Sequence, residues 1–205
     1  MARYTASVCK VCRRINEKLM LKGSRCETPK CAVGRRKRVM GGRRRRVSDR
    51  GLQLAEKQKA RYTYGLLERQ FRQFFERAEK QAGITGDNLK VLLARRLDNV
   101  VQSLGFADSR AQARQLVLHG HILVNGHKVN IASALVKEGD TIRWRESSAK
   151  TKYYKQLFES IQAKSVPSWL SLDRETLAAQ VVSLPIPNET GAVFDSKAIV
   201  EYYSR

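Results

Sequence analysis

The stretch that decides the fold is Arg95–Arg145, RRLDNVVQSLGFADSRAQARQLVLHGHILVNGHKVNIASALVKEGDTIRWR, in which the spacing of the apolar residues changes along the chain. From Leu89 to Gly105 the apolar residues recur every three or four positions, which predicts an amphipathic helix that ends at the glycine. Ser109 is typical of a helix N-cap, and a second helix is predicted from there to Gly120.

Beyond the second helix the apolar period changes to two. His121–Val124 and His127–Val129 are predicted to be strands, joined by the two-residue turn Asn125-Gly126, which needs positive φ. Gly139 lies in a further turn, and Thr141–Arg145 alternates like a half-buried strand. The stretch therefore predicts two helices followed by short antiparallel strands.

Cationic side chains gather on the polar side of this stretch. Guanidinium groups and backbone N–H groups near a helix end can hold the phosphates of A-form RNA, so we interpret the set as an RNA-binding face. For any single arginine, a merely solvated helix face is an equal alternative. The set comprises Arg95, Arg96, Arg110, Arg114, His119, His121 and Lys128.

Three segments carry a resemblance to a known module: RRLDNVV, SRAQARQLV and GHILVNGHKVN. The stretch resembles the small RNA-binding module named after the fourth small-subunit ribosomal protein. That module is also found in some tRNA synthetases, pseudouridine synthases and a heat-shock RNA-binding protein. The resemblance implies RNA binding by residues 93–147.

The charge of the chain indicates a polyanionic partner. Its 205 residues contain 40 Lys and Arg against 19 Asp and Glu, a net charge of +21. Residues 1–50 contribute 17 Lys and Arg against 3 Asp and Glu, so the N-terminal quarter is predicted to make the main electrostatic contact. No apolar run reaches the roughly 20 residues of a membrane span, and no signal peptide is evident, so we expect a cytoplasmic protein without a membrane partner.

All four cysteines lie in one short segment, with the spacing of a metal site. Cys9 and Cys12 form one pair, and Cys26 and Cys31 form a second pair after a loop. Four thiolates favour one structural Zn²⁺, which would fold a segment that has few apolar residues. An iron–sulfur cluster, two disulfides or idle thiols are the alternatives.

Two arginine-rich runs follow the cysteines, and we predict that they bind RNA phosphates. Their charge density prevents them from packing on themselves until phosphate neutralises them. A localisation signal or a solubilising tract is the alternative. The runs are Arg35, Arg36, Lys37 and Arg38, and Arg43, Arg44, Arg45 and Arg46.

A helical body is predicted on either side of the module. Ser48 caps a first helix that extends to Tyr62, and a second helix at Leu66–Ala82 buries its phenylalanines. After the module, a helix is expected at residues 148–164, then a loop whose Trp169 plugs the helical body, a short strand at residues 181–184 and a final helix after Asp195. Further RNA contacts are predicted at Arg50, Lys57, Lys59, Arg61, Arg69 and Arg72.

The predicted fold class is therefore α+β and mainly helical. Residues 1–47 form the zinc-bound basic segment, residues 48–92 and 148–205 form a discontinuous helical body, and residues 93–147 form the inserted RNA-binding module of two helices and short antiparallel strands. No homo-oligomer is expected.

Beyond the module, the chain resembles bacterial small-subunit ribosomal proteins of the S-four family from end to end. The matching segments include SDRGLQLAEKQKARYTYGLLERQFRQFFERA, VPSWLSLDRE and IVEYYSR, and the four cysteines are similar to those of a zinc-containing branch. The resemblance implies a non-enzymatic, primary rRNA-binding protein that joins the small subunit early, at the 5′ domain of its rRNA. It also implies contact with the fifth small-subunit protein, support of translational accuracy, and a position near the mRNA entry channel.

Two other functions compete with this interpretation. Arg96-Leu97-Asp98 is similar to the segment that holds the catalytic aspartate of pseudouridine synthases, but here it lies inside a helix of the module, and a surface or salt-bridge role is favoured. A zinc-dependent DNA-binding regulator is weaker, because the cysteine segment has no recognition-helix pattern.

Overall fold

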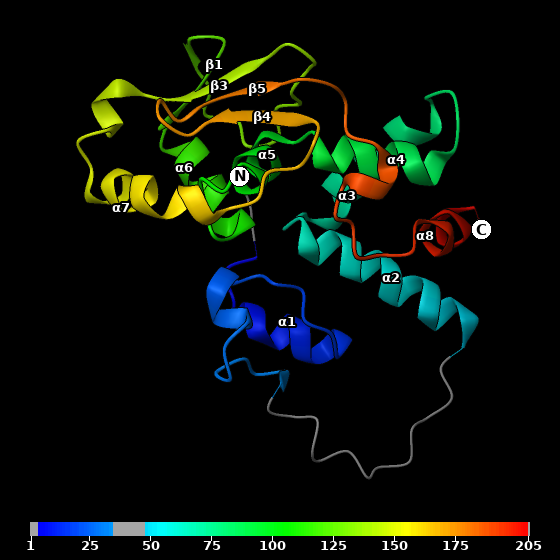
Figure 1. The fold of residues 1–205 in the computed structure, drawn as a ribbon. Coiled ribbons are helices and arrows are strands. Elements are labelled where there is room, and N and C mark those ends of the chain that lie inside the picture. The colour runs from blue at the N-terminus through cyan, green and yellow to red at the C-terminus, as the bar shows by residue number, and fades with distance from the viewer. Residues whose placement is uncertain (1–3, 35–47, 205) are drawn as a thin grey trace. The chain divides into compact units, whose positions relative to one another are not determined.

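The computed structural model describes residues 4–34 and 48–204 and divides the chain into two compact units. The first unit consists of Met1–Lys90 together with Gly191–Arg205, and the second consists of Val91–Thr190 (Figure 1). The two arginine-rich runs between residues 35 and 46 lie outside the described residues, so their RNA contacts stay predictions.

The first unit is helical, as its apolar periodicity predicts. Ser48 caps α2, because its hydroxyl accepts a hydrogen bond from Gly51 N at 3.3 Å. On α3, Phe71, Phe74 and Phe75 are buried, which confirms that these aromatic residues form core. The elements are α1 Val8–Ile15, the short 3₁₀ helix η1 Gly23–Cys26, α2 Asp49–Thr63, α3 Glu68–Glu79, the start of α4 Thr85–Ala94, and α8 Ser196–Tyr203.

The C-terminal helix α8 completes the first unit by packing on α2. Gln53 Nε2 donates to Glu201 Oε2 at 2.8 Å, and the rings of Phe75 and Tyr203 lie 4.5 Å apart. Asp195 caps α8 by accepting from Lys197 N at 2.9 Å, as predicted. The first unit is therefore built from two segments that are far apart in the sequence.

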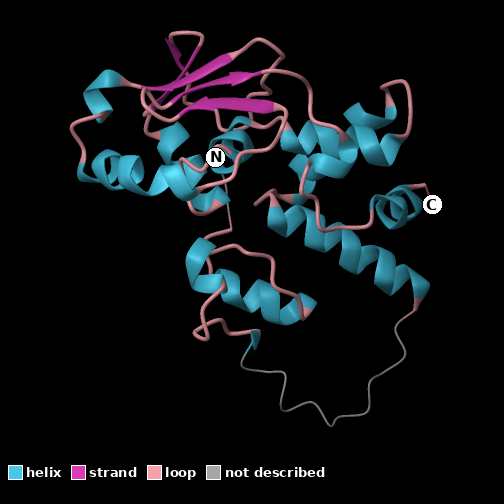
Figure 2. Ribbon diagram, in the orientation of Figure 1, coloured by secondary structure: helices cyan, strands magenta, loops and turns pink. Residues whose placement is uncertain are grey.

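The second unit contains a five-stranded antiparallel sheet in the order β2-β1-β3-β5-β4. Figures 1 and 2 show α5, α6 and α7 on one side of this sheet. Ile122, Ile142 and Ala179 are buried on one face, together with apolar residues of these helices. The elements are α5 Leu97–Ser103, α6 Arg110–Leu118, β1 Ile122–Val124, β2 His127–Lys128, β3 Thr141–Trp144, η3 Glu146–Ser148, α7 Lys152–Ser160, η4 Ile161–Ala163, β4 Leu170–Asp173, β5 Ala178–Val181 and η5 Pro187–Glu189.

The helix predicted to run unbroken to Gly105 is divided into α4 and α5. Arg96 at the break has extended backbone angles, φ −63° and ψ 135°. Leu97 N donates to Ala134 O at 2.8 Å, and Val136 N donates to Arg95 O at 3.0 Å. The backbone at the break thus pairs with a distant segment instead of continuing the helix, and the prediction of one long helix was wrong.

Residues 148–190 were assigned to the helical body, but the structure places them in the second unit. The predicted loop around Trp169 contains strand β4, and the second strand, β5, begins at Ala178, before the predicted strand. Trp169 is buried in the same core as Ile142. Only residues from Gly191 onward return to the first unit. The physical reason is that β5 pairs directly with β3 and extends the sheet of the module.

Candidate nucleic-acid interface

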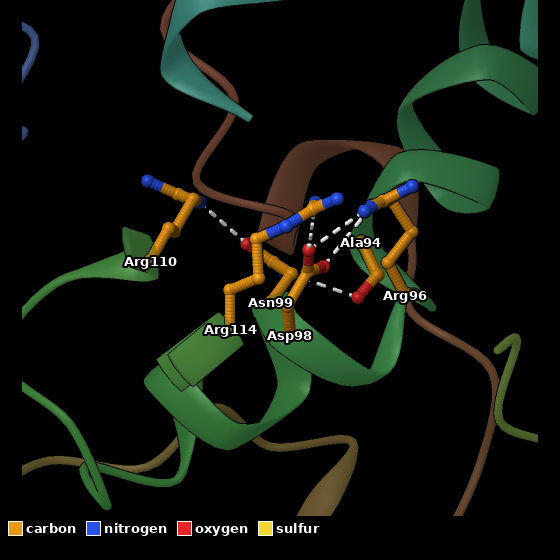
Figure 3. Close-up of polar contacts among 6 residues, drawn as sticks. All are labelled: Ala94, Arg96, Asp98, Asn99, Arg110 and Arg114. Carbon is orange, nitrogen blue, oxygen red and sulfur yellow. Dashed lines mark hydrogen bonds and ion pairs between the residues drawn. The ribbon is translucent and has the colours of Figure 1, made fainter. Parts of the chain in front are cut away.

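A buried ion cluster holds the two helices of the module together (Figure 3). Arg96 lies at the break before α5 and donates to both oxygens of Asp98, from Nε at 3.0 Å and from Nη2 at 2.6 Å. Arg114 on α6 reaches the same carboxylate through Nη1 at 3.2 Å. Asp98 and Arg96 are only 4% and 1% exposed, so this carboxylate is an intramodule ion-pair group, as favoured from the sequence.

This cluster changes the interpretation of two predicted RNA contacts. Arg96 and Arg114 are 1% and 7% exposed, and both direct their guanidinium groups at Asp98. A guanidinium that is buried on a carboxylate presents little surface to a phosphate. The structure therefore gives these two arginines a structural role, where the sequence analysis assigned them to RNA.

The remaining cations of the module are more accessible. Arg95 is half-buried and donates from Nε to Val136 O at 3.0 Å, and Arg110 at the start of α6 donates from Nε to Asn99 Oδ1 at 2.7 Å. His119 and Lys128 are exposed. These side chains come from the helix pair and the hairpin that follows it, as the sequence analysis predicted.

Gly120 allows the hairpin to approach the end of α6 closely. Its φ of +71° favours glycine, and a Cβ at this position would overlap the side chain of Lys128. The glycine was predicted only as a helix stop. It also leaves room for the Lys128 side chain beside the end of α6, near the junction with the hairpin.

His121 lies at the same junction but its side chain is half-buried. Its Nδ1 is 2.8 Å from the hydroxyl of Ser148, and its ring is 6.3 Å from that of Trp144. Burial lowers the pKa of His121, and the nearby charges of His119 and Arg145 lower it further. The neutral imidazole is therefore favoured, and His121 contributes less positive charge to the face than the sequence suggested.

Three α2 residues that were predicted to contact RNA form ion pairs within the protein. Lys57 Nζ lies 2.6 Å from Glu68 Oε1, Lys59 Nζ lies 2.6 Å from Glu17 Oε2, and Arg61 Nη1 lies 3.3 Å from Glu68 Oε2. Burial alone would raise the pKa of Glu68, but the contacts with Lys57, Tyr203 and Arg61 together outweigh burial and lower it.

The burial of these α2 cations gives them a structural role, which differs from the phosphate contact assigned to them. Lys57 and Lys59 are 5% and 9% exposed. By contrast, Arg50 and Arg69 are exposed, and Arg72 is exposed in a pair with Glu76.

The four cysteines line one small cavity of about 20 Å³, together with basic residues such as Lys22 and Lys30. Burial raises the pKa of the Cys12 thiol, and the three other cysteines raise it further. Among the described residues, however, no three His, Cys, Asp or Glu side chains are arranged so that they could hold a metal ion. The thiols are thus gathered around one cavity without a closed ligand set, and bound zinc stays a prediction.

The cysteine segment also contains buried apolar residues, although few apolar residues were expected to stabilise it. Val11, Cys12 and Leu19 are buried together, and Ile15 and Tyr62 pack against them. Tyr62 comes from α2, so the segment joins the first unit through apolar contact as well as through charge.

Two positions that matter for the site were missed from the sequence. Asn99 is 2% exposed and touches Arg110, and Ser148 is 5% exposed and touches His121. A polar residue inside an apolar helical stripe was the available signal for Asn99. Ser148 had no such signal, because its partner is 27 residues away in sequence.

Within the described residues, every helix is too short or too polar to cross a membrane.

Comparison with known proteins gives two family matches that together cover most of the chain. Residues 3–94 match the ribosomal protein S4/S9 N-terminal domain, and residues 95–142 match the S4 domain. The chain is 56% identical over 208 residues to small ribosomal subunit protein uS4 of Dehalococcoides mccartyi (strain CBDB1), with 100% of both chains covered. Proteins of the same name from Pelotomaculum thermopropionicum and Syntrophomonas wolfei are 52% and 51% identical, also over 100% of both chains.

Proposed function

Because this chain belongs to the bacterial ribosomal protein uS4 family, and is thus a structural constituent of the small ribosomal subunit that binds its rRNA, we propose that it is a primary binder of the 5′ domain of that rRNA. In this role it joins the subunit early and nucleates assembly of the subunit body. It acts in the cytoplasm, on the ribosome.

The observation that supports this proposal is that the second unit has two kinds of cationic side chain. Some are buried in ion pairs, and others are accessible at the surface. Asp98 holds Arg96 and Arg114 in the interior, which fixes α6 against α5. Arg110 and Lys128 stay near or at the surface of the same unit, where fixed cations suit the phosphates of a folded, A-form RNA. Recognition of shape follows when cations are held on a rigid scaffold.

The enzyme alternative has little support. The family is not a class of enzymes, and Asp98, the residue that suggested pseudouridine synthesis, is 4% exposed and bound by two guanidinium groups. A catalytic aspartate must reach the reacting base, whereas this carboxylate is enclosed by its partners.

Two further partners belong to the proposal. The family resemblance supports contact with the fifth small-subunit protein, an interface that would support translational accuracy. It also supports a position of the basic N-terminal part near the mRNA entry channel. The net charge of +14 in residues 1–50, from 17 Lys and Arg against 3 Asp and Glu, favours RNA as the neighbour of that part.

The full chain is expected to bind a transcript of the 5′ domain tightly and to discriminate against the same transcript with its helical junction deleted. A shape-specific contact keeps this preference as salt rises, whereas a purely electrostatic contact loses it. Filter-binding titrations at two salt concentrations, with each transcript as competitor of the other, measure the preference. Equal, salt-sensitive binding of both transcripts would contradict the proposal.

We also propose one structural Zn²⁺ held by Cys9, Cys12, Cys26 and Cys31. The support is that the four thiols line one cavity and match the ligand type that zinc prefers. Bound zinc would supply folding free energy by tying two separate parts of the segment together. Four protein ligands leave no open position for a reacting water, so the role is structural.

Replacing Cys26 and Cys31 with serine is expected to abolish zinc binding, unfold the segment around α1 and weaken rRNA binding moderately. Elemental analysis of the purified full chain measures the metal, and hydrogen exchange of α1 peptides measures the local fold. Ser24→Ala in the same segment is the matched control and should retain zinc. Stoichiometric iron in the wild-type chain, or an intact α1 without any metal, would argue against the zinc site.

A further inference from the structure

The break between α4 and α5 creates a backbone group that needs a partner. Ala94 is the last residue of α4, so its carbonyl has lost the N–H that a continuing helix would supply. Asn99 provides the substitute, because its Nδ2 donates to Ala94 O at 3.0 Å. Asn99 is 2% exposed, and an unsatisfied carbonyl at this depth would be costly.

This hydrogen bond determines which way the amide of Asn99 faces. An amide has one accepting oxygen and one donating nitrogen, so donation to Ala94 directs Oδ1 to the other side. There it accepts from Arg110 Nε at 2.7 Å, and Figure 3 shows Asn99 between the two partners. Both contacts agree with a single orientation of the side chain.

The neighbouring residue makes a contrasting contact. Asp98 holds Arg96 and Arg114 with a carboxylate, which compensates positive charge in the interior. Asn99 accepts from Arg110 with a neutral amide oxygen, so this contact orients the guanidinium without adding a negative charge beside it. Adjacent residues on α5 thus bind arginines differently, Asp98 through a carboxylate and Asn99 through a neutral amide oxygen.

We propose that Asn99 is a positioning residue for rRNA binding, which holds Arg110 in the orientation that receives a phosphate. The inference rests on the proposed function. A guanidinium has five N–H donors, and the contact with Asn99 uses the one on Nε, at the base of the planar group. An arginine that is held in this way loses less side-chain freedom when a phosphate binds.

Four variants of the full chain test the proposal by titration with the 5′-domain transcript. Arg110→Ala is expected to weaken binding about tenfold, as for the loss of one charge-assisted hydrogen bond. It should also reduce the log–log salt slope by about 0.7–0.9, the value for one phosphate contact. Asn99→Ala should weaken binding between about twofold and tenfold, because Arg110 loses its fixed orientation. The salt slope should then stay unchanged, since the charge is retained.

The double variant, Asn99→Ala with Arg110→Ala, should bind no more weakly than Arg110→Ala alone, because Asn99 acts through Arg110. Asn99→Asp should reduce the salt slope, since a carboxylate beside Arg110 compensates its charge. Gln102→Ala, at a half-buried position on the same helix, is the control and should leave affinity and slope unchanged. All titrations are made well below the melting temperature of each variant, so that unfolding of a destabilised variant is not mistaken for weaker RNA binding.

A second readout does not depend on RNA. In the free wild-type chain, the Arg110 Nε–H signal in NMR spectra should exchange slowly with water, and in Asn99→Ala it should exchange rapidly. Rapid exchange in the wild type, or additive losses of affinity in the double variant, would overturn the positioning role. If the wild type shows slow exchange but does not prefer the 5′ domain, the proposed function fails while the contact with Arg110 stands.

Discussion

Asp98→Asn is expected to lower the free energy of unfolding of the full chain by about 3–5 kcal/mol, the usual cost of breaking a buried ion pair by removing one partner. The carboxylate is 4% exposed and is the shared acceptor of Arg96 and Arg114. A neutral amide of the same size leaves these two guanidinium groups without their anion in the interior. The packing volume hardly changes, so the effect reports electrostatics rather than a cavity.

Chemical denaturation of the full chain, followed by a spectroscopic signal from Trp144 and Trp169 in the second unit, measures this loss. Glu76→Gln is the matched control, because it breaks the pair between Arg72 and Glu76, whose side chains are 69% and 51% exposed. An exposed pair at this spacing contributes only about 0.3–0.5 kcal/mol. Equal effects of the two substitutions would show that burial does not govern the Asp98 cluster.

Removal of residues 191–205 is expected to destabilise the first unit strongly and to leave the core of the second unit folded. The deletion takes away α8, including Ile199, which is fully buried, and Phe194, which is 7% exposed. It also removes the Tyr203 hydroxyl, which donates to Glu68 Oε1 at 3.1 Å. Loss of one buried large aliphatic side chain alone costs about 2–5 kcal/mol, and here several contacts disappear together.

Hydrogen exchange of peptides from α2 and α3 measures the consequence, with peptides from β1 and β3 as the internal reference. Exchange should accelerate in the helices and stay slow in the strands. Glu201→Gln is the control, since it keeps α8 and alters only the acceptor of the hydrogen bond from Gln53. Unchanged protection of α2 after the deletion would mean that the first unit does not need its C-terminal helix.

Local features of the fold were predictable from the sequence. The caps at Ser48, Ser109 and Asp195 each accept the expected backbone hydrogen bond. Such signals depend on residues within one helical turn. The turn at Asn125 and Gly126, both with positive φ, follows from the same kind of short-range rule.

The features that were missed depend on distant partners. Arg96 interrupts a regular apolar stripe because its backbone bridges to Leu135, far along the chain. Strand β5 joins the module because Ile142 pairs with Ala179, which is not visible in the pattern of either segment. Periodicity describes one element at a time, whereas these contacts are tertiary.

The candidate site was predictable in composition but not in the roles of its members. The sequence identified the cations of the module, yet the difference between Arg114 and Arg110 depends on which carboxylate or amide faces each guanidinium. Asp98 and Asn99 are adjacent and similar in size. Only the three-dimensional arrangement assigns one to the interior ion cluster and the other to the contact with Arg110.

Residues 91–190 separate the two segments of the first unit in the sequence, so these two segments are synthesised at different times. Synthesis proceeds from the N-terminus, so residues 91–190 are made before residues 191–205. α2 emerges early but gains its partner α8 only with the final residues. A chain that terminates between Gly191 and Ser196 therefore contains every strand of the sheet but lacks α8, and the face of α2 that α8 covers stays exposed.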